Sequence, residues 1–254
     1  MASTPKRPAR YNPNIQGGRR NLLIRLGLTA VVVVFAVALV LYIVSSHHKP
    51  AASGEAKAIR VTSSKLITKQ GTSDPKAVLS LYEDFLCPAC GNFEKTLGPT
   101  VNQLIDSGAV AADYHMVAIL DRPQNQNYSS RSGAAGYCVA DQSVDAFRRF
   151  HAALYAPQFQ PREDGSSFPD NAQLIELARK AGAGGNVADC INNGTYTQLV
   201  KGMAAAGNIE ATPTIRINGQ DYRPSTPDAL VAKIKEIVGD VPSLGAPAAA
   251  PGGS

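Results

Sequence analysis

The sequence predicts an α/β fold with an inserted helical domain, preceded by one N-terminal transmembrane helix. Three observations support this. An uncharged apolar run occupies residues 26–44. An apolar strand pattern runs directly into a helical pattern that begins with two cysteines, and a second strand pattern follows. A long helical stretch then precedes a strand hairpin and a last helix. Strand–helix–strand order with short connections is typical of a parallel βαβ unit.

The apolar run at 26–44 holds no charge and no proline. As a helix it would span roughly 28 Å, close to the hydrocarbon thickness of a bilayer. We expect an uncleaved anchor over residues 26–46. One alternative is a signal peptide cleaved near Ala51 and Ala52, but its apolar region would be shorter. The other is a buried helix of a soluble protein, which the basic flank disfavours.

The basic residues are concentrated before this run. The formal net charge is +5, and residues 1–25 contain six basic side chains and no acid, so the rest sums to 5 − 6 = −1. The positive-inside rule then predicts a cytoplasmic tail at 1–25 and a single-pass protein of the cell membrane whose main domain is extracytoplasmic. A near-neutral main domain gives no reason to expect a nucleic-acid partner.

One compact domain is predicted at 59–238, between a linker at 47–58 and a disordered tail rich in Pro, Ala and Gly at 239–254. Its first part reads as an edge strand at 59–68, a central buried strand at 77–86, a helix at 90–107 ended by Gly108, and a strand at 110–120.

The helical insertion covers about residues 125–207. Its expected helices lie at 130–155, 171–183, 187–192 and 196–206. The chain then returns to a hairpin, with strands at 214–217 and 221–223 joined by an Asn218-Gly219 turn. An amphipathic helix at 227–238 closes the domain.

Cys87 and Cys90 form a C-x-x-C motif, with Pro88 and Ala89 between them, where a strand meets a helix. A helix N-terminus favours negative charge and lowers the pKa of a thiol, and the thiolate is the nucleophile in disulfide exchange. We therefore expect Cys87 to be an exposed catalytic nucleophile and Cys90 to be the resolving thiol one turn later. The orientation of the nearby Glu83 and Asp84 is left open.

Three other interpretations of these cysteines stay open. Cys87 and Cys90 could form a plain structural disulfide, although so short a loop stabilises little. All four cysteines could bind zinc, which would favour a second close pair. The thiols could also be free and buried.

Cys138 and Cys190 lie 52 positions apart within the insertion. An even number of cysteines in an extracytoplasmic domain permits disulfides. We expect a structural disulfide between them, with a second redox relay as the alternative. His115 and His151 are expected to be packed or surface residues rather than catalysts.

Pro213 begins a strand pattern, where proline removes a backbone donor, and a cis Thr212–Pro213 bond would satisfy the geometry. The segments L-x-Y-E-D-F-L-C-P-A-C and A-T-P-T-x-x-I-N-G, separated by a helical insertion, resemble the DsbA-like branch of the thioredoxin superfamily. The resemblance covers about residues 59–238. With the anchor and the extra cysteine pair, the chain is most similar to the membrane-anchored actinobacterial members.

This resemblance implies a thioredoxin-like fold in which a cis Pro213 packs against the active-site cysteines and the Thr212 backbone pairs with an extended client chain. Cys87 would be the nucleophile and Cys90 the resolving thiol, with no metal or organic cofactor. The sequence departs from many DsbA relatives at Ala89, where they have histidine. Ala89 offers the thiolate neither charge nor donor, which leaves the oxidising strength open.

The resulting functional hypothesis is a protein disulfide oxidase, a monomer that introduces disulfide bonds into exported proteins with reduced cysteines. A membrane reoxidase of the DsbB or vitamin K epoxide reductase-like type would be its recycling partner. One alternative is a disulfide reductase or isomerase of the same fold. An alternative of another class is a membrane-tethered binding protein or chaperone with structural cysteines.

Overall fold

The computed structural model describes residues 57–241 of the 254-residue chain. Within this range no helix combines the length and the apolar character needed to span a bilayer. The expected cytoplasmic tail at 1–25, the anchor at 26–46 and almost all of the linker at 47–58 lie outside the described residues. So does most of the tail at 239–254. The expectations for those segments therefore stay predictions.

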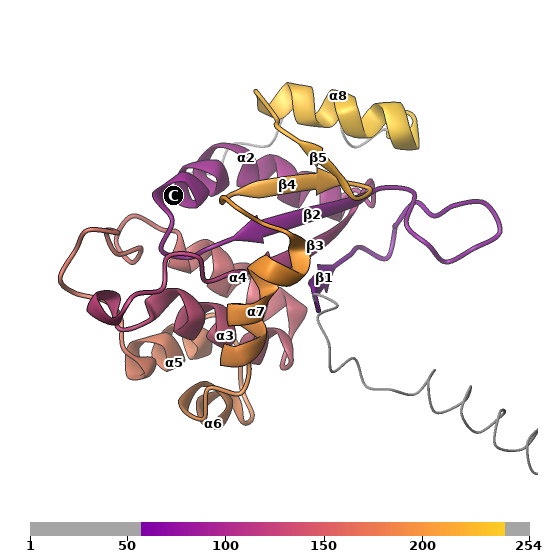
Figure 1. Ribbon diagram of the computed structural model, residues 1–254. Coiled ribbons are helices and arrows are strands. Elements are labelled where there is room, and N and C mark those ends of the chain that lie inside the picture. Colours follow the sequence, from indigo (N-terminus) through magenta and orange to yellow (C-terminus); the bar gives the residue numbers. More distant parts are fainter. Residues whose placement is uncertain (1–56, 242–254) are drawn as a thin grey trace, which may run out of the picture. The chain divides into compact units, whose positions relative to one another are not determined.

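A five-stranded sheet forms the centre of the domain, in the order β1-β3-β2-β4-β5 (Figure 1). Its strands are β1 (Ile59–Val61), β2 (Val78–Glu83), β3 (Ala111–Met116), β4 (Thr214–Ile217) and β5 (Gln220–Tyr222). β2 and β3 are parallel and are connected through helix α2 (Pro88–Asp106), whereas the other neighbouring pairs are antiparallel. The predicted α/β fold with a parallel βαβ unit is confirmed.

β2 is the central strand, and its apolar sequence explains that position. Leu79 and Leu81 point to one face of the strand and are fully buried, and Tyr82 on the other face is also buried, so the strand is covered on both faces. Its last residue, Glu83, pairs with Met116 of β3. The chain then leaves the sheet and reaches the first turn of α2 within four residues, which places the two cysteines at this edge of the sheet.

The insertion between β3 and β4 is helical, as predicted. After the short 3-10 helix η1 (Pro123–Asn125) it contains α3 (Tyr128–Ala140), α4 (Val144–Leu154), α5 (Asn171–Lys180), α6 (Val187–Asn192) and α7 (Thr197–Gly207). The last helix, α8 (Pro227–Val238), packs against α2. In Figure 1, α8 and the helices α3 to α7 lie on opposite sides of the strands.

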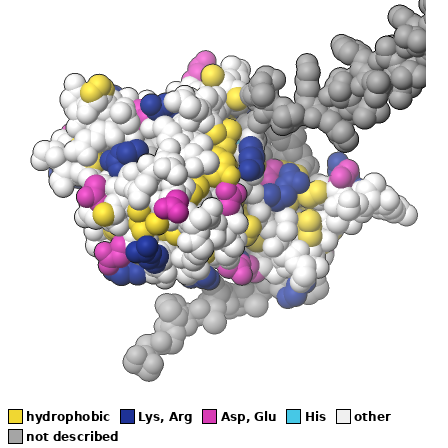
Figure 2. All heavy atoms as spheres, turned by 90° about the horizontal axis from the view of Figure 1, so that it is seen from below, with side chains coloured by type: hydrophobic (Ala, Val, Ile, Leu, Met, Phe, Trp, Pro, Cys, Tyr) yellow, Lys and Arg dark blue, Asp and Glu magenta, His cyan; other side chains and the backbone are white. Residues whose placement is uncertain are grey.

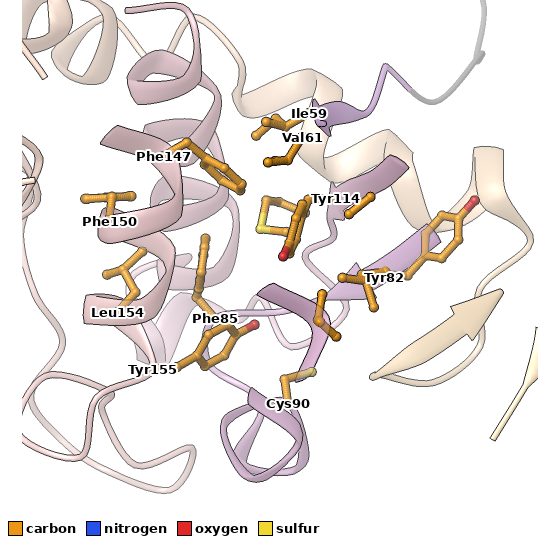
Figure 3. Close-up of a cluster of buried hydrophobic side chains, with 14 of the residues drawn as sticks. Ile59, Val61, Tyr82, Phe85, Cys90, Tyr114, Phe147, Phe150, Leu154 and Tyr155 are labelled. Carbon is orange, nitrogen blue, oxygen red and sulfur yellow. The ribbon is translucent and has the colours of Figure 1, made fainter. Parts of the chain in front are cut away.

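Aromatic side chains fill the core between the sheet and the insertion (Figure 3). Tyr114 of β3 meets Phe147 of α4 at a ring-centroid distance of 5.4 Å. Phe85, in the loop after β2, meets Tyr155 at 5.0 Å. Because Phe85 is two residues before Cys87, this core directly supports the loop that carries the cysteines.

The predicted strand at 59–68 is wrong in its length. β1 ends at Val61, and the Leu66 amide then donates to the Ser63 carbonyl at 3.1 Å, which forms a turn. The serine pair at 63–64 favours that turn over a longer strand. The predicted ending of α2 is confirmed: Gly108 has a φ of +80°, and a Cβ there would lie 2.1 Å from the Lys65 carbonyl oxygen.

The single helix predicted at 130–155 is also wrong, because the structure has two helices there. Ser143 is extended, with a φ of −164°, and its hydroxyl oxygen accepts a hydrogen bond from the Ala146 amide at 3.2 Å. This is an N-cap, which starts α4 and separates it from α3. The apolar periodicity of the sequence continues across the break between α3 and α4, so the pattern alone does not indicate that two helices are present.

The described residues carry charges of both signs on their surface. On the face drawn in Figure 2, Lys and Arg side chains are interspersed with Asp and Glu.

Cys138 of α3 and Cys190 of α6 form a disulfide with a Cα–Cα distance of 5.8 Å. It links two helices of the insertion, and Cys138 is fully buried. Because both sulfurs are used in this bond, the four-cysteine zinc site is ruled out. Cys87 and Cys90 are both free thiols, so the structure represents the dithiol form.

We predict that the double substitution Cys138→Ser/Cys190→Ser lowers the free energy of unfolding by about 4 kcal/mol, because the bond closes a loop of about 53 residues. Urea unfolding followed by circular dichroism measures this. Disulfide exchange at Cys87 and Cys90 should persist in the folded variant. Loss of exchange with unchanged stability would instead favour a redox relay.

Candidate active site

Cys87 is the N-cap residue of α2. Its backbone is extended, with φ −72° and ψ 119°, and Pro88 occupies the first turn, where a missing N–H costs nothing. The Cys87 amide donates to the Asp84 carbonyl at 2.9 Å, and the Gly91 amide donates to the Cys87 carbonyl at 3.2 Å. These bonds fix the turn from β2 into α2 and hold the sulfur at the positive end of the helix.

Cys90 lies one turn behind Cys87 and is fully buried. Pro88 and Ala89 are exposed between them. The Cys87 side chain is only 7% exposed, so the expectation of an open nucleophile is wrong. Neighbouring residues cover most of Cys87, and the exposed part of the motif is the Pro88-Ala89 dipeptide.

The segment before β4, which is distant in the sequence, lies against Cys87 and covers it. The Thr212–Pro213 peptide bond is cis. The Cys87 Sγ lies 3.5 Å from the Thr212 carbonyl oxygen, and the thiol donates to it. The structure thus brings together Cys87, Cys90, Thr212 and Pro213, which are up to 126 positions apart, because β4 pairs with β2.

The surroundings of the two thiols shift their pKa values in opposite directions. Hydrogen bonds from the Cys90 thiol, from the Thr212 side chain and from the amides of the first helical turn outweigh burial and lower the pKa of Cys87 to about 6. Burial, together with the nearby Cys87 and Glu83 charges, raises the pKa of Cys90 far above its ordinary value. At neutral pH the reduced site therefore holds one thiolate and one thiol, the pattern of a nucleophile and a resolving thiol.

Glu83 and Asp84, whose orientation the sequence left open, are both fully buried. The Asp84 carboxylate accepts hydrogen bonds from the amides of Leu86 at 2.9 Å and Leu120 at 3.0 Å. Burial nevertheless raises its pKa to about 6. Asp84 thus ties the cysteine loop to the chain after β3.

Gln160 supports the cysteine loop from the helical insertion, and sequence reasoning did not find it. Its side-chain amide donates to the carbonyls of Cys87 at 3.0 Å and Phe85 at 3.3 Å. A Cβ atom on residue 91 would lie only 2.2 Å from the Gln160 side-chain oxygen. Glycine at this position therefore leaves room for the Gln160 side chain. No local pattern marks Gln160, because it lies in an irregular loop after α4.

Two histidines were expected to be packed or surface residues rather than catalysts. His115 stacks on Tyr82 with ring centroids 4.3 Å apart, and burial lowers its pKa to about 4. His151 is buried beside Glu83 and Glu94, and the ligand atoms of these three residues lie within 4.8 Å of one another. His151 Nε2 is 2.8 Å from Glu83 Oε2, which is a hydrogen-bond distance.

A surface pocket of about 580 Å³ opens beside the cysteine motif. It is lined by Pro88, Arg122, Gln160 and Arg162, among others. It therefore joins the exposed part of the C-x-x-C motif to the loop of the insertion, and it has room for side chains of a chain that approaches Cys87.

Comparisons with known proteins agree with this arrangement. The thioredoxin family model matches residues 64–236. A crystal structure described as reduced DsbA from Mycobacterium tuberculosis is 66% identical, with a TM-score of 0.73 and coverage of 74% of this chain and 95% of that one. Another, described as the reduced form of a disulfide bond oxidoreductase (DsbG) from the same organism, is 66% identical, with a TM-score of 0.74 and coverage of 76% and 93%.

A curated relative of another kind matches part of the chain. The serine/threonine-protein kinase PknE of Mycobacterium tuberculosis is 32% identical over 126 residues, which are 49% of this chain and 22% of the kinase. The chain thus spans less than a quarter of that protein's length. This similarity carries no kinase activity over to the chain.

We predict that Cys87 in the reduced protein reacts with iodoacetamide with an inflection near pH 6, because the hydrogen bonds from Cys90 and the first helical turn lower its pKa. Its thiolate is retained above that pH and is lost as the pH falls through 6. Mass spectrometry of the alkylated protein measures the rate. Cys90→Ala should move the inflection upward, because it removes the main donor to the Cys87 sulfur. An inflection above pH 8 in the unsubstituted protein would contradict this.

Proposed function

The chain belongs to the thioredoxin family, and from this membership and the site around Cys87 we propose that it is a DsbA-type thiol–disulfide oxidoreductase that introduces disulfide bonds into exported proteins. One observation carries the proposal. Cys87 lies at the N-terminus of α2 with a lowered pKa, against the cis Thr212–Pro213 segment and in front of the buried Cys90. The similarity to the Mycobacterium tuberculosis DsbA structure supports the same activity.

The exchange proceeds in two steps. A client thiolate attacks the Cys87 sulfur of the oxidised enzyme, the Cys87–Cys90 bond breaks, and Cys90 leaves as a thiolate that takes up a proton. A second client thiolate then attacks the client sulfur of the mixed disulfide. Cys87 leaves as a thiolate, the client carries a new disulfide, and the enzyme has gained two electrons.

The lowered pKa of Cys87 favours this direction. At pH 7 a thiol with a pKa of about 6 is mostly ionised, which stabilises the reduced folded enzyme by roughly 1 kcal/mol relative to a thiol with an ordinary pKa near 9. For a two-electron couple this raises the reduction potential by a few tens of mV. A site that is more stable when reduced gives up its disulfide more readily.

Client recognition is proposed to use backbone pairing at Thr212 and Pro213. The Thr212 carbonyl accepts a hydrogen bond from the Cys87 thiol. This carbonyl therefore lies next to the path that the backbone around an attacking client cysteine would take. Strand addition at this segment would hold clients of many sequences, because main-chain hydrogen bonds do not depend on side chains. The pocket beside Pro88 would receive neighbouring client side chains.

The proposed location is the cell membrane, with the N-terminus in the cytoplasm, the anchor at 26–46 and the catalytic domain outside. The uncharged run and its basic flank support this. A reoxidase is the general kind of partner that a disulfide donor needs, since each turnover leaves a dithiol. We propose a membrane reoxidase of the DsbB or vitamin K epoxide reductase-like type, and a monomeric enzyme.

A reductase or isomerase is the second candidate function. Two similar structures from one organism are described by different names, DsbA and DsbG, so similarity alone leaves the net direction open. The asymmetry between Cys87 and Cys90 serves exchange in either direction. It argues against a chaperone with purely structural cysteines, because such a protein needs no activated thiolate.

We predict a Cys87–Cys90 reduction potential between about −120 and −180 mV, the range of known disulfide oxidants and isomerases. Equilibration of the full-length protein with glutathione buffers, followed by alkylation and mass spectrometry, measures it. The Cys138→Ser/Cys190→Ser variant is the matched control and should give the same value. A potential near about −270 mV, as in thioredoxin, would favour the reductase. An absence of exchange would favour the chaperone.

We predict that a cysteine at the C-terminus is outside the cell. In a Cys87→Ser/Cys90→Ser background, Ser254→Cys should react with a membrane-impermeant maleimide in intact cells, and Ser3→Cys should react only after lysis. The protein should stay in the membrane fraction with its N-terminus intact. Labelling of Ser254→Cys only after lysis would contradict the proposed orientation, and loss of the first 50 or so residues would indicate cleavage.

A further inference from the structure

The pocket beside the cysteine motif has two walls that come from different parts of the chain. Arg122, in the loop between β3 and α3, belongs to the first wall, and the segment 157–164 of the insertion forms the second. Pro88, which directly follows Cys87, also lines the pocket. A client is bonded to Cys87 during exchange, so the client residues next to its cysteine lie within reach of this pocket.

The backbone of Arg122 is held in a tight turn. Its amide donates to the Asn125 side-chain oxygen at 3.0 Å, and its carbonyl accepts from the amides of Asn125 at 3.1 Å and Asn127 at 3.2 Å. Asn125 is itself buried, and its side-chain amide donates to the Leu120 carbonyl at 2.6 Å. Gln126 and Asn127 have φ angles of 56° and 52°, in the left-handed region that residues other than glycine rarely adopt. This turn fixes the point from which the Arg122 side chain extends.

Arg131 of α3 connects the loops that form the two walls. Its guanidinium donates to the Gln126 carbonyl at 2.9 Å and to the Pro169 carbonyl at 2.9 Å. Gln126 belongs to the loop of the first wall, and Pro169 belongs to the same irregular segment as the second. Gln160 of the second wall donates to the Cys87 carbonyl at 3.0 Å. The pocket is therefore already formed next to Cys87 before a client arrives.

The pocket carries charges of both signs, but two of them neutralise each other. Arg162 forms an ion pair with Asp164 at 2.9 Å. Arg122 and Glu163 form no ion pair within the described residues. Asp121, beside Arg122 in the sequence, is turned towards α3, where it accepts a hydrogen bond from a backbone amide at 3.0 Å. The pocket thus offers a client one unpaired positive charge and one unpaired negative charge.

These two charges differ in how firmly they are held. Glu163 lies in an exposed turn, in which the Gly165 amide donates to the Arg162 carbonyl at 3.0 Å. Arg122 extends from the turn that the buried Asn125 fixes. A charge on a fixed backbone loses less conformational entropy when it binds an opposite charge, and it therefore discriminates better between partners. These observations favour Arg122 as the charge that a client meets.

We propose that Arg122 gives the enzyme a preference for clients that carry an acidic side chain close to the reacting cysteine. The client carboxylate enters the pocket beside Pro88 and pairs with the Arg122 guanidinium while the client sulfur is bonded to Cys87. This inference rests on the proposed exchange activity and names a class of client for it. It adds a side-chain contact to the backbone pairing at Thr212, which by itself does not depend on the client sequence.

The apolar part of the pocket strengthens such a pair. It comes from the rings of Pro88, Pro157 and Pro161. Proline has no N–H, so these residues do not compete with Arg122 as donors to a carboxylate. They also displace water, which makes an ion pair stronger than on an open surface. The same rings could receive an aromatic client side chain, and the experiment below separates the two occupants.

Exchange with a set of peptides tests the preference. Each peptide holds two cysteines and carries Asp, Ala, Lys or Tyr at one of the positions next to this pair. Oxidised full-length protein is mixed with each reduced peptide at pH 7 and quenched with acid, and mass spectrometry measures the rate of peptide oxidation. An acidic neighbour also raises the pKa of the peptide thiol itself. Each rate is therefore divided by the rate of the same peptide with glutathione disulfide.

The unsubstituted protein should oxidise the best Asp peptide about 3- to 5-fold faster than the Ala peptide, the upper range for a largely exposed ion pair. Arg122→Gln should remove this preference, Arg122→Lys should keep part of it, and Arg122→Glu should make the Lys peptide faster than the Asp peptide. Added salt should weaken the preference in the unsubstituted protein. Arg179→Glu makes the same charge change at an exposed arginine of α5 outside the pocket, and it is the matched control.

Several results would overturn the role of Arg122. One is the absence of an Asp preference, or an Asp preference that Arg122→Glu leaves intact. Another is an equal loss in Arg179→Glu, which would indicate attraction by net charge alone. A Lys preference that Glu163→Gln abolishes would assign the pocket to basic clients, and a Tyr preference that neither charge affects would assign it to aromatic ones. Failure to oxidise any peptide is a different result, because it would overturn the proposed exchange activity itself.

Discussion

The hydrogen bonding of the Cys87 sulfur at the start of α2 is the constraint on which the rest of the site depends. The sulfur accepts from the Cys90 thiol and from the first-turn amides, and it contacts the Thr212 carbonyl. These groups come from two distant parts of the chain. They meet only because β2 ends next to the helix and β4 pairs with β2. The mixed sheet is thus the scaffold that a low thiol pKa requires at this point.

The helical insertion contributes to the same constraint and does more than cover the sheet. Phe85 packs against Tyr155 at 5.0 Å, and Gln160 holds the carbonyls of the cysteine loop. Both partners come from the end of α4 or the loop after it. The insertion also supplies His151, which completes the buried group under the motif. A change in how α4 docks would therefore reach Cys87 and Cys90 by way of the loop and of the acids beneath it.

The parts of the fold that follow from local patterns could be predicted from the sequence. α6 and α8 have the predicted bounds, and the β2–α2–β3 unit lies where apolar period and cysteine spacing indicate. The strand at 59–68 and the helix at 130–155 were wrong because a serine turn and a serine N-cap compete with apolar periodicity. Gln160 carries no pattern.

The pKa values of the two neighbouring thiols are shifted in opposite directions, which explains how one motif can accept and release a client. Helix amides and the Cys90 thiol donate hydrogen bonds to the Cys87 sulfur, which makes Cys87 a good leaving group when a client departs. Burial makes Cys90 a poor thiolate, so it holds a proton while Cys87 is engaged. The cost of this arrangement is that Cys90 must exchange its proton in a water-poor site.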